Sequence, residues 1–258
     1  LIKFMLYVKF FMKISALVIV KNEEKKINAC LLSLPFVDEI VVVLDGCNDN
    51  SKKISKTFTN KIFEGEWEFE GDRRNFGIQK CSSEWILEID ADEIVSKELA
   101  KEIKNLINYT RFDYHYIYLT NYVHNIPILN GWTACLAPEG KFCLFKKDSK
   151  IWDNQRVHPD YKLTGEKGLA LKSKIQHKMS DNISELVLRF NRNTDLRAMD
   201  LRDSEKSFSK YFSIRKVFSR FLKCYIIKKG YKEGMIGLLI SILSSIYPIV
   251  SAIKSRNI

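Results

Sequence analysis

The chain has 258 residues, of which 46% are apolar and 28% charged, and this balance excludes an intrinsically disordered protein. Its six Cys are scattered with no Cys-x-x-Cys and no His pair at metal-ligand spacing, which argues against a disulfide framework and a thiolate zinc site. Of the formal net charge of +11, residues 201–258 contribute 12 Lys or Arg against 3 Asp or Glu, so an anionic partner is expected there.

Residues 1–11 are apolar and basic but lack the small-residue cleavage site of a signal peptide. We interpret them as an upstream extension or a short arm that touches a membrane. Residues 12–180 are expected to form one α/β domain, and residues 181–258 a basic helical extension.

Short apolar runs alternate with helical periodicity over the first 110 residues. The predicted strands are residues 14–20, 40–44, 61–63 and 85–90. The predicted helices lie between Asn22 and Pro35, after Ser51, over 71–81 and over 96–109, with Asn22 as the cap of the first. Strands that alternate with helices at this spacing predict a doubly wound, mostly parallel sheet with right-handed crossovers.

The pattern changes after Thr110. Further strands are predicted over residues 114–120, 141–146 and 169–175, and the loops at 125–140 and 151–167 are expected to face a ligand. From about Asn182 the chain is helical and basic, with aromatic residues interleaved.

Residues 235–253 contain no charge over 19 positions, while a membrane-spanning helix needs about 20 apolar residues. Gly237 and Pro248 interrupt the segment, and a basic stretch precedes it. We therefore expect a membrane-interfacial helix that lies in one leaflet. The alternative is a core helix of the extension.

Two carboxylates, Asp90 and Asp92, follow the predicted strand at 85–90. In an open α/β sheet ligands bind at the carboxyl ends of the strands, and oxygen pairs of this kind suit Mg²⁺ or Mn²⁺ together with substrate phosphates. Lys21 and Glu23 follow the first strand and Asp45 the second, so all five should meet at one edge. Taken alone, Asp-x-Asp is more typical of a plain loop or a helix cap than of a metal site, so the motif depends on its context.

The pattern of residues 14–24, 41–49, 74–77 and 85–93 resembles family 2 inverting glycosyltransferases with the GT-A fold. The subgroup it resembles is the bacterial lipopolysaccharide-core β-glucosyltransferases, which share a Phe-x-Leu-Phe strand (here residues 142–145) and a Val-His motif (here residues 157–158). No Gly-x-Gly-x-x-Gly or Gly-Lys-Ser/Thr loop is present, which argues against dinucleotide oxidoreductases and P-loop enzymes.

The resemblance implies a nucleotide pocket formed by Ile19, Lys21, Glu23, Asp45, Arg74 and Asp90. It further implies that Asp92 ligates Mg²⁺ or Mn²⁺ directly, while Asp90 is shared between the metal and the ribose. Arg73 and Arg74 can both add positive charge near the phosphates, and of the two Arg73 is the better candidate for a merely solvated residue.

Inversion requires a base that takes the proton of the acceptor hydroxyl. Many members of the subgroup carry an acid beside the Val-His motif, and in this chain the acid is displaced by one residue to Asp160. Asp160 is the predicted catalytic base, Glu139 is the second candidate, and His158 is expected to orient a group or contact a phosphate.

The resemblance implies transfer of a hexose, with glucose as the candidate, from a UDP-type nucleotide-sugar donor to a lipopolysaccharide-core or other lipid-linked acceptor. The basic extension implies a cytoplasmic enzyme held peripherally at the anionic inner face of the cytoplasmic membrane. Two alternatives remain: an enzyme like a sugar-nucleotide pyrophosphorylase, and a non-enzymatic nucleic-acid-binding protein. The uncharged stretch at 235–253 argues against the second, so no nucleic-acid partner is predicted.

Overall fold

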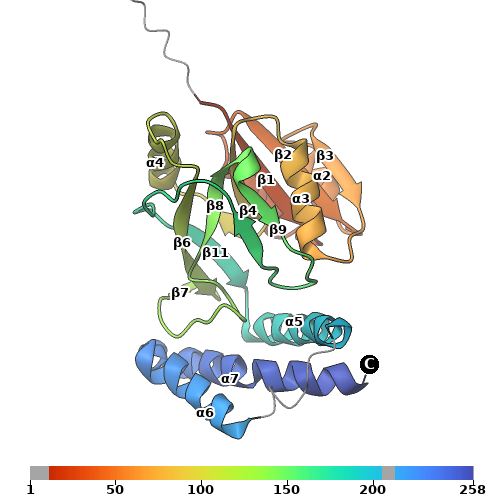
Figure 1. Ribbon diagram of the computed structural model, residues 1–258, viewed down its shortest axis with the longest axis vertical. Helices are drawn as coiled ribbons and strands as arrows, with labels where there is room; N and C mark the ends of the chain where they lie inside the picture. The colour runs from red at the N-terminus through yellow and green to blue at the C-terminus, as the bar shows by residue number, and fades with distance from the viewer. Residues whose placement is uncertain (1–11, 205–212, 258) are drawn as a thin grey trace, which may run out of the picture.

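The computed structural model describes residues 12–204 and 213–257, so the predicted arm at 1–11 lies outside the described residues (Figure 1). In chain order the elements are β1 (Ile14–Val20), α1 (Ile27–Leu32), β2 (Glu39–Asp45), α2 (Ser51–Ser55), β3 (Ile62–Gly65), α3 (Glu70–Lys80), β4 (Trp85–Asp90), β5 (Glu93–Ile94), α4 (Lys97–Ile107), β6 (Tyr114–Val123), β7 (Ile126–Ile128), β8 (Gly140–Lys146), β9 (Lys150–Trp152), β10 (Tyr161–Leu163), β11 (Ile175–Ser180), α5 (Ile183–Asp203), α6 (Ile214–Leu222) and α7 (Gly234–Asn257). Short turns of 3₁₀ or π helix, η1 (Lys147–Ser149), η3 (Lys223–Ile227) and η4 (Gly230–Glu233), connect some of them.

The main sheet has the strand order β3-β2-β1-β4-β8-β6-β11-β5, with β7 paired to β6. Its first four strands are parallel, as the alternation of strands and helices predicted. Beyond β4 the sheet becomes mixed, because β8 pairs antiparallel with both β4 and β6. β9 and β10 form a separate two-stranded sheet.

Both faces of the parallel half are buried, which explains its nearly continuous apolar strands. Along β1, Leu17 and Ile19 face the core beneath α3, while Ala16 and Val18 face the core beneath α1 and α4. This alternation follows from the two-residue period of a strand. The doubly wound α/β arrangement expected from the sequence is confirmed for this half of the sheet.

The helices α5, α6 and α7 form a layer below the sheet in Figure 1, with α5 between the sheet and the other two. Leu186 and Phe190 of α5 share a core with Ile240 and Tyr247 of α7 and with Trp132 from the β7–β8 loop. The helical stretch Gly230–Arg256 is long and apolar enough to cross a membrane, but half of its most apolar window is buried inside the protein.

Two local predictions were wrong. The last strand of the main sheet spans Ile175–Ser180 rather than 169–175, and Leu169 is 84% exposed. Asn22 does not cap α1: it has a left-handed φ of 55° and its side chain accepts a hydrogen bond from the Asn48 amide at 2.9 Å, while α1 begins at Ile27. The acidic run after β1 is therefore a loop, which leaves Glu23 free to face the carboxyl edge of the sheet.

We predict that Gly77→Ala destabilises the protein because α3 packs against β1 without space for a methyl group. A Cβ at Gly77 would lie 2.5 Å from Leu17 Cδ1 and 3.1 Å from Val43 Cγ2. Overpacking of this kind costs about 1–3 kcal/mol. Denaturant unfolding measures the loss, and Gln79→Ala, an exposed position on the same helix, should change stability by less than about 0.5 kcal/mol. Equal stabilities for the two variants would contradict the packing described.

Candidate active site

The carboxyl ends of β1, β2 and β4 meet at one edge of the sheet, as predicted. The register of the parallel strands places Ile19 opposite Asp90 and Val20 opposite Leu44, so Asp45 and Asp90 leave the sheet at neighbouring levels. Ile19 itself is buried in the core beneath α3, whereas Lys21 is 55% exposed. The structure thus brings most of the predicted nucleotide-binding residues together at this edge, while Ile19 lies in the core below them.

Asp45 is buried and fully paired. Its Oδ1 accepts a hydrogen bond from the Trp67 amide at 3.0 Å, and its Oδ2 pairs with Arg73 at 2.5 Å and Lys21 at 3.1 Å. Burial alone would raise the pKa of Asp45, but these three partners together hold that pKa below its usual value. Arg73 is therefore not a solvated residue, contrary to the sequence interpretation.

Arg74 is almost fully buried and serves as a hub for three carboxylates. Its guanidinium pairs with Glu70 at 2.6 Å, Glu88 at 2.5 Å and Asp90 at 2.9 Å. Burial acts against the charge of Arg74, yet Asp90, Glu70 and Glu88 raise its pKa well above the usual value. Because every side of the guanidinium is engaged, Arg74 fixes the position of Asp90 in this arrangement.

Asp90 is the more exposed carboxylate of the Asp-x-Asp pair. Its Oδ1 is held by Arg74 and its Oδ2 lies 2.9 Å from Lys141 Nζ, which also pairs with Glu93 at 2.7 Å. Burial raises the pKa of Asp90, but Arg74 and Lys141 outweigh it and lower that pKa. Lys141, at the start of β8, is a site residue that the sequence analysis did not identify.

Asp92 is buried and faces α5 and β11. Its Oδ2 lies 2.7 Å from Arg189 Nη2 and 3.3 Å from His177 Nε2. Burial raises the pKa of Asp92, and His177 and Arg189 together lower it well below the usual range. Neither residue was predicted as part of the site. Arg189 was expected in the basic extension, and the strand that carries His177 was predicted over residues 169–175.

The environment of His177 suits a metal ligand. Asn121 donates from Nδ2 to the Pro138 carbonyl at 3.0 Å, which leaves its Oδ1 to accept from His177 Nδ1 at 2.7 Å. With Nδ1 facing Asn121, Nε2 faces a carboxylate oxygen of Asp92 at 3.3 Å, and either a proton on Nε2 or a metal ion between the two atoms makes this contact favourable. Fixing Nδ1–H by an outer partner is the usual arrangement around a metal-bound His.

The protein supplies only part of a coordination shell. Within residues 12–204 and 213–257, no three His, Cys, Asp or Glu side chains are grouped so as to hold a metal. Asp92 and His177, 3.3 Å apart, are the pair close enough to share an ion. Mg²⁺ or Mn²⁺ held there would take its remaining ligands from water and a substrate diphosphate, which is the way such ions commonly bind.

The three candidate bases lie on two loops that reach the same edge of the sheet. Glu139 precedes β8 and its carboxylate pairs with Lys228 at 2.7 Å. His158 is exposed, has a left-handed φ of 50°, and its Nε2 lies 3.2 Å from the Cys135 carbonyl. Asp160 is exposed, and no ion pair among the described residues engages its carboxylate. None of the three contacts Asp90 or Asp92.

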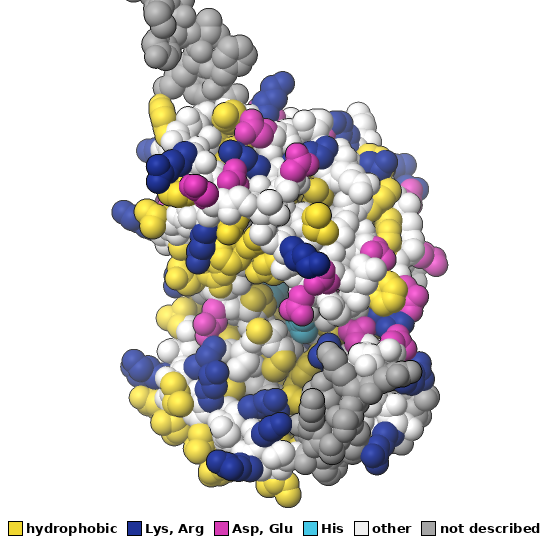
Figure 2. All heavy atoms as spheres, viewed as in Figure 1, with side chains coloured by type: hydrophobic (Ala, Val, Ile, Leu, Met, Phe, Trp, Pro, Cys, Tyr) yellow, Lys and Arg dark blue, Asp and Glu magenta, His cyan; other side chains and the backbone are white. Residues whose placement is uncertain are grey.

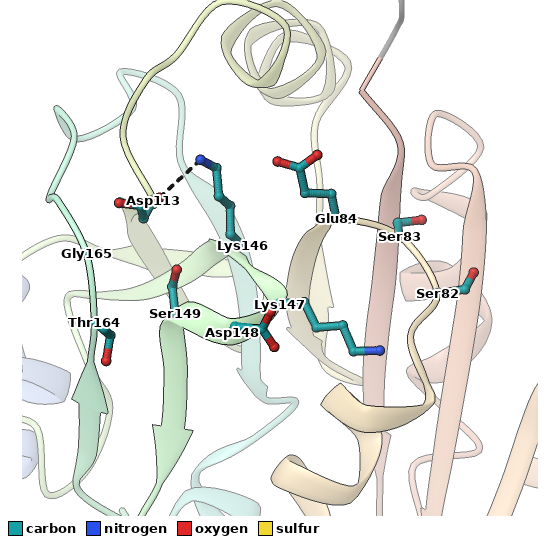
Figure 3. A pocket seen from close by; sticks show the side chains of 10 residues that line it. All are labelled: Ser82, Ser83, Glu84, Asp113, Lys146, Lys147, Asp148, Ser149, Thr164 and Gly165. Atoms are coloured by element: carbon teal, nitrogen blue, oxygen red, sulfur yellow. Dashed lines mark ion pairs between the residues drawn. The ribbon is translucent and has the colours of Figure 1, made fainter.

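A separate open cavity of about 670 Å³ lies at the opposite edge of the sheet (Figure 3). It is lined by the turn before β4 and the end of β8, including Ser83, Glu84 and Lys146, and an ion pair of 3.1 Å joins Lys146 to Asp113 there. The amino ends of parallel strands are not where open α/β sheets bind ligands. We therefore place the site at the carboxyl edge.

The sequence model of glycosyl transferase family 2 matches residues 15–158, which include the carboxyl edge from Lys21 to Asp92. The chain belongs to this family. It is 26% identical over 256 residues to an uncharacterized glycosyltransferase of Rickettsia typhi, covering 95% of this chain and 87% of that one. It is 24% identical over 252 residues to the lipopolysaccharide core biosynthesis glycosyltransferase LpsC of Rhizobium meliloti, covering 93% and 91%. Family membership removes the pyrophosphorylase alternative.

Among solved structures, the chain is similar to TarS of S. aureus, with 15% identity, a TM-score of 0.47 and coverage of 95% and 89%. It is also similar to glucosyl-3-phosphoglycerate synthase of Mycobacterium tuberculosis, crystallised with Mg²⁺ and UDP, with 16% identity, a TM-score of 0.36 and coverage of 43% and 44%.

We predict that the stability of the metal-free protein depends on pH through Glu23. Burial and the charge of Asp92 raise the pKa of Glu23 to about 7 from 4.5. The folded protein binds this proton more tightly than the unfolded chain does. The contribution of Glu23 to the free energy of unfolding is therefore fully present below pH 4.5 and is lost as the pH rises through 7. Between these two pH values, the free energy of unfolding of Glu23→Gln should rise by roughly 2 kcal/mol relative to that of the wild type.

Chemical unfolding in the presence of EDTA at both pH limits measures this difference. Glu66→Gln, which removes an exposed carboxylate, is the matched control for loss of one charge. A stability difference between Glu23→Gln and the wild type that does not change with pH would contradict the assignment.

Proposed function

We propose that this glycosyltransferase moves a hexose, with glucose as the candidate, from a UDP-type nucleotide sugar to a lipopolysaccharide-core or other lipid-linked acceptor, with inversion at the sugar. The observation that carries the proposal is the convergence of Asp45, Asp90 and Asp92 at the carboxyl edge of the sheet, with His177 beside Asp92. The name of the Rhizobium meliloti relative supports the acceptor class.

Each group at this edge has a part that its surroundings support. Asp45 is an ionised acceptor that would take hydrogen bonds from the base of the nucleotide once Lys21, the exposed partner of its Oδ2, moves aside. Asp90 would lie between ribose and metal, and Asp92 and His177 would hold the metal. A bound Mg²⁺ or Mn²⁺ supplies charge stabilisation for the departing diphosphate, so no acid is needed at that oxygen.

Lys141 and Arg189 add positive charge that the sequence interpretation lacked. Both already touch the Asp-x-Asp carboxylates, so a donor bound there would bring its phosphates within reach of an ammonium and a guanidinium. Cations fixed in a buried site stabilise developing negative charge more strongly than cations in water.

For the base, Asp160 remains the proposal. Its loop lies against the start of α3, where the Glu70 amide donates to the Gln155 carbonyl at 2.9 Å. The Asp160 carboxylate is exposed, whereas that of Glu139 is engaged by Lys228 and Nε2 of His158 by a carbonyl. An unengaged carboxylate is free to accept the proton of the acceptor hydroxyl as the oxygen attacks the anomeric carbon.

We predict that metal binding and donor binding are linked at Asp92 and His177. The wild type should show a Mn²⁺-dependent thermal shift with a UDP-hexose, and Asp92→Asn or His177→Gln should weaken Mn²⁺ binding on the order of 10–100-fold. Titration calorimetry with Mn²⁺ alone gives a reading independent of turnover. Asp113→Asn, at the cavity on the opposite edge, is the control and should bind normally. The proposal fails if no nucleotide sugar shifts the wild type.

We predict that Asp160→Asn lowers kcat on the order of 10²–10⁴-fold and leaves binding of the donor unchanged, because only the proton acceptor is removed. Single-turnover transfer assays and donor titrations separate the two effects. Asp153→Asn, a carboxylate on the same loop, serves as the matched control. Normal turnover by Asp160→Asn would exclude Asp160 as the base. The same assays would then be applied to Glu139→Gln, the second candidate.

A further inference from the structure

Large apolar side chains stand exposed along α6 and the turns that follow it. We call this surface the α6 face, and its apolar members are Ile214, Phe218, Leu222, Ile226, Ile227, Tyr231 and Met235. Ile214, Phe218, Leu222 and Ile226 recur every four residues, so they lie along one side of the helix. Ile214 is 84% exposed and Met235 is 80% exposed, and no residue of α6 is buried.

The opposite side of the same segment is fixed against the protein. Cys224 and Gly230 are buried, and a Cβ at Gly237 of α7 would lie only 1.9 Å from the Gly230 carbonyl oxygen. The rings of Phe221 and Tyr225 stack at 5.3 Å. Since this side is already packed, the apolar side chains of the α6 face cannot turn inward without moving the turn around Gly230.

The α6 face is also strongly basic. Residues 213–235 contain seven Lys or Arg and one acidic residue, Glu233, whose carboxylate accepts from Asn130 Nδ2 at 2.5 Å and from the Leu129 amide. Arg215, Lys223, Lys229 and Lys232 are exposed. Figure 2 shows basic and hydrophobic side chains interspersed over the lower left of the helical layer. Exposed apolar side chains ringed by Lys and Arg are the composition of helices that lie in a membrane interface.

We propose that the α6 face is seated in the headgroup region of an anionic lipid bilayer. Ile214, Phe218 and Ile227 enter the boundary of the acyl chains, and the exposed lysines pair with lipid phosphates. This assignment differs from the sequence interpretation, which gave the membrane contact to residues 235–253, the part of α7 whose inner side packs on α5. The membrane contact itself does not depend on the proposed function. Only its purpose, which is to bring the active site to a lipid-linked acceptor, rests on that function.

The α6 face is joined directly to the candidate active site. Lys228 Nζ donates to the Trp132 carbonyl at 2.7 Å and pairs with Glu139, which lies two residues before Lys141. The Gly131 amide donates to the Lys228 carbonyl at 2.9 Å. A bilayer at the α6 face therefore lies against the segment that leads into β8 at the carboxyl edge of the sheet.

Sedimentation of the full chain with vesicles tests the proposal. The wild type should bind vesicles of phosphatidylglycerol and phosphatidylethanolamine, bind phosphatidylcholine vesicles weakly, and lose affinity at high salt. Ile214→Ser/Phe218→Ser and Lys229→Gln/Lys232→Gln should each weaken binding on the order of tenfold. Leu169→Ser, equally exposed on the α/β part, and Lys101→Gln/Lys104→Gln on α4 are the matched controls and should bind as the wild type does.

Full binding by Ile214→Ser/Phe218→Ser, or equal loss in the control variants, overturns the proposal. Size-exclusion chromatography of the same variants detects the other possible occupants of the α6 face. The membrane proposal is also overturned by a dimer that these substitutions dissociate, or by an RNA complex in place of vesicle binding. Binding of a UDP-sugar in solution is measured in parallel. Vesicle binding without any nucleotide-sugar binding would refute the proposed function and leave the membrane proposal standing.

Discussion

The structure depends on the neutralisation of acidic side chains at the carboxyl edge of the sheet. Asp45, Glu88, Asp92 and Glu93 are buried there, and Asp90 is partly exposed beside them. An unpaired buried charge costs several kcal/mol, and removing one partner of a buried pair destabilises a protein by about 3–5 kcal/mol. The partners come from separate elements: Arg73 and Arg74 from α3, Lys141 from β8, Lys150 from β9 and Arg189 from α5. Charge balance thus holds these elements together around the site.

The same balance constrains how the proposed reaction can begin. Asp90 and Asp92 are already paired with internal cations, so a bound metal ion would have to displace or share those partners. The ammonium of Lys141 and the guanidinium of Arg189 would then be available to neutralise a diphosphate. Metal binding and phosphate binding are therefore expected to be cooperative, because each supplies the countercharge that the other leaves unsatisfied.

The local signals in the sequence were sufficient for the parallel half of the fold. The β-branched run at 14–20 and the apolar run at 85–90 became strands because burial on both faces demands such composition, and the acids after them reached a common edge. His177 and Arg189 could not be predicted in the same way. Their roles come from contacts with Asp92 across 85 residues or more of chain, and nothing in the local pattern distinguishes Arg189 from the solvated arginines around it.

The helical layer shows why mean hydropathy is a poor guide to the surface that could meet a membrane. The uncharged stretch of α7 is the most apolar segment of the layer, yet its inner side packs on α5, and Tyr247 Oη donates to the Asn193 carbonyl at 3.1 Å. The basic α6 is less apolar, but all of its residues are at least partly exposed. A bilayer competes only for apolar surface that the fold has left uncovered, so position in the tertiary structure, rather than mean hydropathy, decides which helix can meet a membrane. One side of α5 presents Arg189 to Asp92, and the other side packs against α7. The helical layer that presents the α6 face therefore also neutralises Asp92.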